Sequence, residues 1–214
     1  MFVADWMTRK VVTVTPDETI AAAAKLCRDK GIKHLPVIQR RQIKGILSDR
    51  DIREYVPSRA KTLDVCDLHA VIENTKVKDV MRTDIVLTTA DTPVEEAAMI
   101  MLDNNIGCLP VVQGSMLVGI ISDRDIYRVL VDISGVRHRG HRICLPLEDR
   151  PGSLNEIVTI IRKQGFRLQS ILTSYEGVKQ GSRRVVIRIK GAGNFRALKA
   201  ELESTYIGVK IRKG

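Results

Sequence analysis

One stretch of about fifty residues occurs twice in the chain, and both copies keep a single register. Gly-Ile-Leu-Ser-Asp-Arg-Asp-Ile at 45–52 returns as Gly-Ile-Ile-Ser-Asp-Arg-Asp-Ile at 119–126, an offset of 74 residues. The same offset relates Met7 to Met81 and the Leu-Pro-Val at 35–37 to that at 109–111. A repeated sequence folds into a repeated supersecondary unit, so this register restricts the fold more than any other feature.

The repeated stretch joins a predicted strand to a predicted helix. A short apolar run is typical of a strand, and Ser48 or Ser122 then begins a helix with Asp51 or Asp125 three residues later, which is a capping-box pattern. A helix N-terminus after a strand also offers free N–H groups to an anion. A carboxylate one turn into the helix can accept hydrogen bonds from sugar hydroxyls. The spacing alone favours the cap.

The rest of each copy follows one plan. In the first copy we expect, in chain order, a strand at 11–14, a helix at 20–30 ended by Gly31, and strands at 35–38 and 43–47. In the second copy, Thr92-Pro93 begins the helix and Asn104-Asn105 ends it. Pro36 indicates an edge strand or a strand start. Residues 57–75 have no counterpart in the second copy, and 63–72 could form a short helix there.

These motifs, in the same order in both copies, resemble a tandem pair of CBS domains (the cystathionine-beta-synthase type, or Bateman module). The resemblance covers residues 1–131 and implies βαββα repeats, with CBS domain 1 at 1–56, a linker at 57–75 and CBS domain 2 at 76–131. In that family the Ser/Thr and Asp of the last motif contact the phosphate and ribose of adenine nucleotides, and the stretch before Leu-Pro-Val lines the pocket. The resemblance therefore implies a regulatory ligand such as AMP, ADP, ATP or a related adenosine compound, with no required cofactor and no metal. The nucleotide-binding residues that it implies are Thr13, Ile32, Lys33, His34, Pro36, Ser48, Arg50, Asp51, Ile106, Gly107, Cys108, Pro110, Ser122, Arg124 and Asp125.

The two copies differ where the ligand should lie. Lys33-His34 in the first copy becomes Gly107-Cys108 in the second, so we expect two unlike sites, the first with more cationic groups for phosphate. Arg50 and Arg124 could reach phosphate, or they could equally be solvent-facing charges. His34 alone is more often a structural or surface histidine than a ligand contact.

The net charge of +10 lies entirely in the last third of the chain. Residues 138–214 hold 16 Lys/Arg and 6 Asp/Glu, whereas the preceding residues hold 19 of each. This asymmetry allows contact with nucleic acid, an acidic protein or an anionic ligand, or a solvated basic surface. Cys27, Cys66, Cys108 and Cys144 have no metal-type spacing, and we expect reduced thiols, buried at Cys27 and Cys144. No apolar run is long enough to span a membrane and no signal peptide is visible, so we expect a cytoplasmic protein.

Residues 138–214 follow a different pattern from the repeats. After a basic, flexible linker at 135–140, we expect strands at 141–147, 166–175, 184–189 and 206–211, with a helix after the first strand, ended by Gly165, and another between the last two, capped by Asn194. The order βαββαβ matches a ferredoxin-like unit, so the chain as a whole is of the α+β class. This order, with Asp-Arg-Pro-Gly-Ser-Leu at 149–154 after the first strand, resembles an ACT domain. That family pairs side by side and binds amino acids at the interface, which here implies Asp149, Gly152, Ser153, Leu154 and Asn155, although many ACT domains only dimerise. Pro151 and Gly152 could also be only a helix-starting proline and a turn residue.

The full order resembles the acetoin-utilisation-type CBS–ACT proteins, a name that does not establish a role in acetoin metabolism. We find no P-loop, no Cys/His zinc set and no nucleophile elbow, so we do not expect an enzyme. The favoured class is a homodimeric regulatory protein that binds an adenine nucleotide, and an amino acid as a further ligand, and acts on an unknown protein partner. Nucleic-acid binding by the basic C-terminal domain is the alternative, not expected because its cations alternate along strands as on a solvated sheet face. A purely structural dimer is a third reading.

Overall fold

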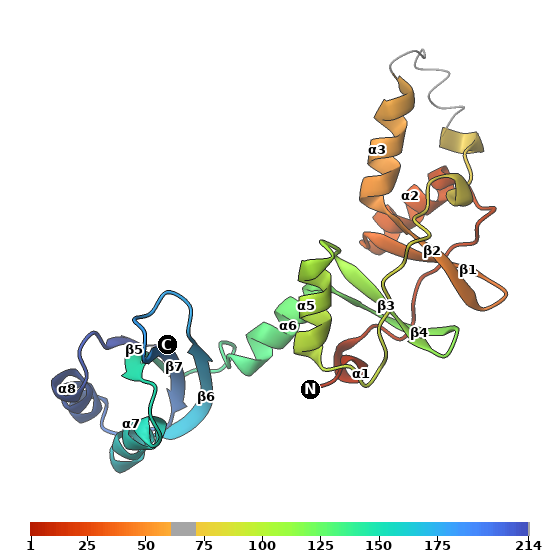
Figure 1. Cartoon of the computed structure of the whole chain (residues 1–214). Coiled ribbons are helices and arrows are strands. Elements are labelled where there is room, and N and C mark those ends of the chain that lie inside the picture. Colours follow the sequence, from red (N-terminus) through yellow and green to blue (C-terminus); the bar gives the residue numbers. More distant parts are fainter. Residues whose placement is uncertain (61–71, 214) are drawn as a thin grey trace. The chain divides into compact units, whose positions relative to one another are not determined.

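A computed structural model describes residues 1–60 and 72–213 as two compact units, Met1–Ile126 and Tyr127–Gly214 (Figure 1). The first unit contains, in chain order, α1 Val3–Trp6, α2 Ile20–Lys30, β1 His34–Gln39, β2 Gln42–Ser48, α3 Asp49–Ala60, η1 Val77–Asp79, α5 Val94–Asp103, β3 Cys108–Gln113, β4 Met116–Ser122 and the start of α6 Asp123–Ile133. Its sheet has the strand order β1-β2-β4-β3, so each repeat supplies one hairpin. The α+β class with repeated units is confirmed.

Local sequence explains where these elements begin and end. Thr19 caps α2 by accepting a hydrogen bond from the Ala22 N–H, and Gly31 ends the helix at a positive φ of 62°. The predicted helix at 20–30 is confirmed. Pro36 lies in β1, an edge strand as predicted, where a missing N–H is tolerated.

One prediction for the first repeat is wrong. The predicted strand at 11–14 is reduced to one isolated bridge from Val14 to Val37, because only the N–H and C=O of Val14 reach the β1 backbone. In the linker predicted at 57–75, the first residues continue α3 to Ala60. Residues 72–74 are helical, and the rest of the short helix predicted at 63–72 lies outside the described residues.

The two repeats exchange their N-terminal segments. Val3 and Met7 are buried in the core cluster of the second repeat, with Leu109 and Ile121. Val77 is in turn buried in the core cluster of the first. A spatial domain therefore combines the leading segment of one repeat with the hairpin and helices of the other.

A glycine in each hairpin permits this exchange. A Cβ at Gly45 would lie 2.7 Å from Met81 Sδ and 2.8 Å from the Arg82 carbonyl oxygen, and a Cβ at Gly119 would overlap Met7 Sδ. Strands β2 and β4 pair with each other only at Gln42 and Met116. Beyond that pair, isolated bridges to the exchanged segments hold each strand, Ile46 with Arg82 and Ile120 with Thr8.

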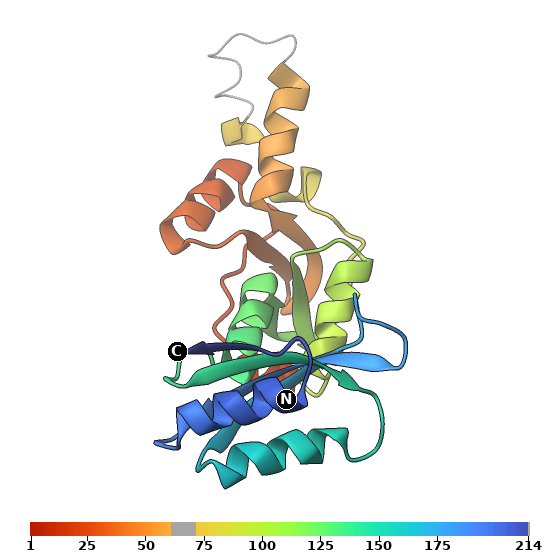
Figure 2. The same ribbon diagram turned by 90° about the vertical axis from the view of Figure 1, so that its left-hand side faces the viewer.

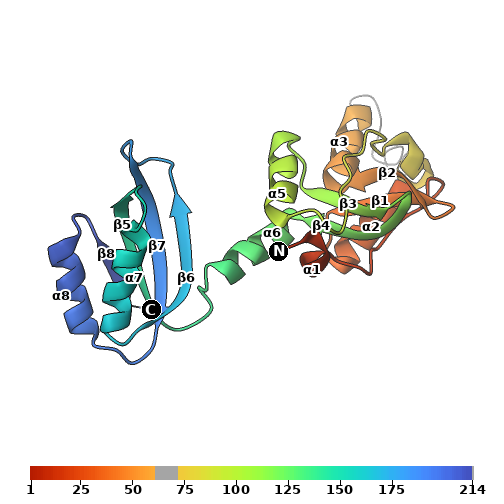
Figure 3. The same ribbon diagram turned by 60° about the horizontal axis from the view of Figure 1, so that its bottom comes forward.

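The second unit contains β5 His141–Glu148, α7 Ser153–Lys163, β6 Arg167–Ser174, β7 Ser182–Lys190, α8 Phe195–Thr205 and β8 Lys210–Lys213. The predicted order is confirmed, and the strands form an antiparallel sheet in the order β6-β7-β5-β8. Figures 2 and 3 show α7 and α8 side by side on one face of this sheet. The last strand begins at Lys210 and not at Tyr206 as predicted, because a turn with Gly208 at a φ of 77° precedes it.

The first part of the linker predicted at 135–140 is fixed to the second sheet. The Ser134 carbonyl oxygen accepts hydrogen bonds from Ser170 Oγ at 2.9 Å and Arg188 Nε at 3.2 Å. Gln169 Nε2 donates to the Gly135 carbonyl oxygen, and Gly135 is buried. The flexible segment predicted from sequence therefore cannot begin before residue 136.

Among the described cysteines, Cys27 and Cys108 are buried free thiols, whereas Cys144 is partly exposed, so its predicted burial is wrong. Cys66 lies outside the described residues. Over residues 1–60 and 72–213, no helix is long and apolar enough to cross a membrane. The same residues contain no cluster of three His, Cys, Asp or Glu side chains suited to a metal ion.

Candidate functional site

A cavity of about 640 Å³ lies within the first unit, between the two repeats. This volume suits a small organic ligand. The first repeat contributes Lys33, His34, Ile46, Ser48, Asp49, Arg50, Asp51 and Arg53, and the rest of the lining is Arg82, Asp84, Ile85, Val86, Asn105, Ile106, Gly107, Cys108, Pro110 and Asp123. The site thus forms where the β2–α3 junction faces the segment before β3 and the exchanged segment that follows η1.

The β2–α3 junction has the capping-box geometry that the sequence predicts. Asp51 Oδ2 accepts hydrogen bonds from the Ser48 N–H at 2.9 Å and from Ser48 Oγ at 2.5 Å. In the reciprocal hydrogen bond, the Asp51 N–H donates to Ser48 Oγ at 3.1 Å. One oxygen of the Asp51 carboxylate is therefore committed to the helix start.

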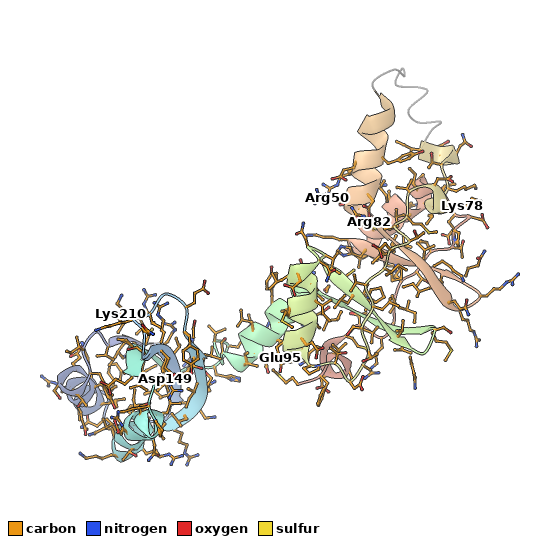
Figure 4. The ribbon with its side chains drawn as sticks, viewed as in Figure 1. Arg50, Lys78, Arg82, Glu95, Asp149 and Lys210 are labelled. Carbon is orange, nitrogen blue, oxygen red and sulfur yellow. The ribbon has the colours of Figure 1, made fainter. Side chains whose placement is uncertain are left out.

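The other oxygen of Asp51 is held by Arg82, a residue that the sequence analysis did not single out. Arg82 Nε donates to Asp51 Oδ1 at 2.9 Å. Burial acts to raise the pKa of Asp51, but hydrogen bonds from Ser48 and Arg82 outweigh it and hold this pKa below its usual value. The Asp51 side chain is only 9% exposed, whereas that of Arg82 is 60% exposed. Figure 4 shows Arg82 and Arg50 near the base of α3.

The second repeat has the same cap but a different neighbour. Asp125 Oδ2 accepts from the Ser122 N–H at 3.0 Å and Ser122 Oγ at 2.7 Å, and Asp125 is 7% exposed. The isolated bridges make Thr8 the counterpart of Arg82, so the corresponding position next to Ile120 carries no charge.

His34 contacts Gly107 across the cavity. A Cβ at Gly107 would lie 3.0 Å from His34 Cε1, so glycine leaves room for the imidazole. Burial lowers the pKa of His34 below its usual value, although the carboxylates of Asp123 and Asp51 act in the opposite direction. This shift favours the neutral imidazole in the cavity without a ligand. Burial, with a smaller effect of Asp123, raises the pKa of Cys108 to about 12, so this thiol stays protonated.

Nine of the predicted nucleotide-binding residues line the cavity. These are Lys33, His34, Ser48, Arg50, Asp51, Ile106, Gly107, Cys108 and Pro110. Thr13, Ile32, Pro36, Ser122, Arg124 and Asp125, which the structure also describes, lie outside its lining. Arg50 Nε forms an exposed ion pair with Glu54 at 2.7 Å, so its charge is already partnered.

The lining combines groups of opposite charge. Its cations are Lys33, Arg50, Arg53 and Arg82, and its carboxylates are Asp49, Asp51, Asp84 and Asp123. Carboxylates accept hydrogen bonds from sugar hydroxyls, and guanidinium and ammonium groups bind phosphate. The cavity is therefore chemically suited to a ligand that has both.

The loop predicted to bind an amino acid lies between β5 and α7. Gly152 has a φ of 87° and precedes Ser153, which is almost completely buried and accepts a hydrogen bond from Arg183 Nη2 at 3.1 Å. Asp149 forms an ion pair with Arg183 at 3.6 Å. Leu154 packs against the core of the unit, and the Asn155 carbonyl oxygen accepts from Thr159 Oγ1. Of the five predicted residues, only Ser153 lines the cavity of about 1100 Å³ described in this unit.

Comparison with known proteins relates the chain to several others. The CBS domain-containing protein YhcV of Bacillus subtilis is 32% identical over 124 residues, which are 58% of this chain and 81% of YhcV. Protein MJ0188 of Methanocaldococcus jannaschii is 27% identical over 216 residues, 99% of this chain and 70% of MJ0188. The second match includes the C-terminal unit.

Solved structures resemble the chain over about three fifths of its length. A candidate acetoin utilization protein (AcuB) from Vibrio cholerae matches with a TM-score of 0.54 and 28% identity, over 64% of this chain and 95% of that one. The CBS domain pair of protein MJ0100, in complex with 5′-methylthioadenosine and S-adenosyl-L-methionine, matches with a TM-score of 0.52 and 26% identity over 61% and 99% of the two chains. CBSX2 in complex with AMP matches with a TM-score of 0.53 and 25% identity over 62% and 97%.

The family described as "CBS domain" matches residues 3–58 and 77–132. These two segments contain both Ser-Asp motifs and the whole cavity lining. The chain therefore belongs to the CBS-domain family, of which it carries a tandem pair.

Proposed function

We propose that the protein is a non-catalytic regulator that binds an adenosine compound in the cavity between its two CBS repeats. The observation that carries the proposal is the Asp51–Arg82 pair in that cavity. It places a carboxylate that can accept hydrogen bonds from hydroxyls 2.9 Å from a guanidinium that can donate to phosphate. Support also comes from the related CBS pairs of MJ0100 and CBSX2, which hold 5′-methylthioadenosine, S-adenosyl-L-methionine and AMP.

In the proposed complex the ribose hydroxyls donate to Asp51, and the phosphate accepts from Arg82 and Lys33. Arg82 exchanges its bond to Asp51 for one to phosphate, so the carboxylate oxygen that it releases becomes an acceptor for a hydroxyl. The adenine lies against the apolar side of the cavity, formed by Ile85, Val86 and Ile106. Both CBS domains, proposed at 1–56 and 76–131, therefore contribute to one ligand.

Calorimetric titration of the full chain with AMP, ADP, ATP, 5′-methylthioadenosine and S-adenosyl-L-methionine tests the function. We expect at least one of them to bind, and Asp51→Ala to weaken that ligand about tenfold to a hundredfold, the loss of a charge-assisted hydrogen bond. The same variant also loses the helix cap, which should cost on the order of 1 kcal/mol of unfolding free energy. No binding of any of the five, together with no change in melting temperature, would rule out the adenosine sensor.

For residues 138–214 we propose an ACT domain that pairs two chains and offers an amino-acid site at the β5–α7 loop. The supporting observation is the antiparallel order β6-β7-β5-β8 with Gly152 in the left-handed region before α7, which has no side-chain cap. The Ser153 N–H donates to the Arg150 carbonyl oxygen, so the N–H groups that follow it in the first turn are the ones a ligand could use. We expect light scattering to give the mass of a homodimer at micromolar concentration. A monomer would contradict the pairing role, and calorimetry with the twenty amino acids tests the ligand separately.

A further inference from the structure

One face of the C-terminal sheet is packed and the other carries cations. Ile143, Val185, Ile187 and Ile189 are completely buried against α7 and α8. Because side chains alternate along a strand, the residues between them lie on the opposite face. That face bears Arg142, Arg184, Arg188, Lys210 and Arg212, here called the basic sheet face.

The strand register places these cations in rows. Arg142 on β5 is paired with Arg188 on β7 and with Arg212 on β8, so three arginines lie directly opposite one another across three strands. Lys210 is opposite Cys144 in the next row, and Arg184 is opposite Pro146 in the row after it. Directly opposed side chains have Cβ atoms about 4.5–5.5 Å apart, and like charges in these positions destabilise a sheet.

These charges are not neutralised within the described part of the chain. None of the five cations forms an ion pair there; Arg188 donates to the Ser134 carbonyl oxygen and Arg184 to that of Gly177. Glu148, which alternation places on the same face, accepts from Arg150 Nε at 3.1 Å. The folded unit thus keeps a repulsion that an anionic partner would relieve.

We propose that the basic sheet face binds single-stranded nucleic acid through its phosphates. Four of the five cations are arginines, whose planar guanidinium group binds phosphate with two hydrogen bonds and stacks on bases. Four-stranded sheets bind single-stranded RNA in other proteins, where aromatic side chains stack on the bases; on this face arginines would take that part. A membrane surface is a poorer fit, because binding to lipid needs large exposed apolar groups beside the cations. Leu172, Cys144 and Val186 on this face are all partly buried.

This site is separate from the adenosine cavity, which lies in the first unit, so either proposal can fail without the other. Fluorescence anisotropy of the full chain with a labelled twenty-nucleotide poly-U RNA tests it between 50 and 200 mM salt. With three to five phosphate contacts, the logarithm of the binding constant should fall against the logarithm of salt with a slope of about −2 to −3.5. No binding at 50 mM salt would overturn the proposal.

Two triple variants that remove the same charge distinguish binding by the basic sheet face from a general effect of the protein's net charge. R142S/K210S/R212S removes three face cations for which no hydrogen bond is seen within residues 1–60 and 72–213, and should make the slope shallower by about 2. R162S/R196S/K199S removes the same charge from exposed positions of α7 and α8 and should leave most of the binding. Equal losses in both variants would overturn the proposal.

If the triple variant does not fold, a more conservative variant can still test the proposal. R142K/R212K retains the charge and loses the planar group, so poly-U should bind several-fold more weakly. A twenty-residue poly-glutamate or phosphatidylserine vesicles that bind the wild type as tightly as poly-U would assign the face to an acidic protein or a membrane instead.

Discussion

Replacing Arg82 by threonine, the residue at the equivalent position of the other repeat, should remove recognition of phosphate and leave recognition of the nucleoside. Arg82 is the cation that reaches Asp51, and its exposed guanidinium can turn to an incoming phosphate. A charge-assisted hydrogen bond contributes about 1.5–3 kcal/mol. Because the Arg82 side chain is 60% exposed, we expect the lower end, which is about a tenfold loss of AMP affinity.

The same change should cost little stability. Asp51 keeps its two hydrogen bonds from Ser48 when Arg82 is replaced, so the R82T variant should keep its fold. Isothermal titration with AMP and with adenosine measures both ligands on one preparation. We expect AMP to weaken about tenfold and adenosine to be almost unchanged.

Lys78 provides the control. Its ammonium group forms an exposed ion pair with Asp17 at 2.9 Å, and it does not line the cavity, although it precedes Arg82 by four residues. Figure 4 shows both side chains. The K78T variant should bind AMP as the wild type does. Equal weakening of AMP and adenosine by R82T, or wild-type AMP binding, would refute phosphate recognition by Arg82.

Three further predictions concern the two Ser-Asp motifs, His34 and Gly45. The D51N variant should weaken ATP more than D125N does, because Arg82 lies beside Asp51 and a threonine occupies its place in the other repeat; equal titration curves would contradict this. Burial lowers the pKa of His34, so its contribution to the free energy of unfolding is complete above about pH 6.5 and is lost as pH falls through the lowered pKa. Between pH 7.5 and pH 5.5, the free energy of unfolding measured in urea should therefore fall less for H34Q than for the wild type. The G45A variant places a methyl group 2.8 Å from a backbone carbonyl oxygen and should cost about 1–3 kcal/mol in the same assay.

The repeat and its motifs could be predicted because they depend on local sequence. Ser48 and Asp51 form the cap that their spacing indicates, since a capping box needs only residues one turn apart. The alternation of Val185, Ile187 and Ile189 likewise identifies the packed face of β7 without knowledge of its neighbours.

Arg82 could not be found in this way because its role depends on the exchange of segments. Within its own repeat, Arg82 belongs to a short stretch with no motif, 31 residues from the carboxylate that it contacts. The packing of Met81 against Gly45 and the backbone bridge between Arg82 and Ile46 bring that stretch to the first repeat. The 74-residue offset does pair Arg82 with Thr8, so the difference in charge is visible in the sequence once the exchange is known.

The exchange also limits how independent the two repeats can be. The cavity beside Asp51 is completed by residues 82–86, which precede the helix and hairpin of the second repeat. The position matching Arg82 in the other repeat, next to Ile120, is filled by Thr8, at the start of the first repeat. A ligand that draws Arg82 away from Asp51 therefore acts on a segment joined to the second repeat. A ligand shifts an equilibrium only if it binds two states with unequal affinity. Here the two states are Arg82 bonded to Asp51 and Arg82 released from it, and a phosphate-bearing ligand would bind the second more tightly.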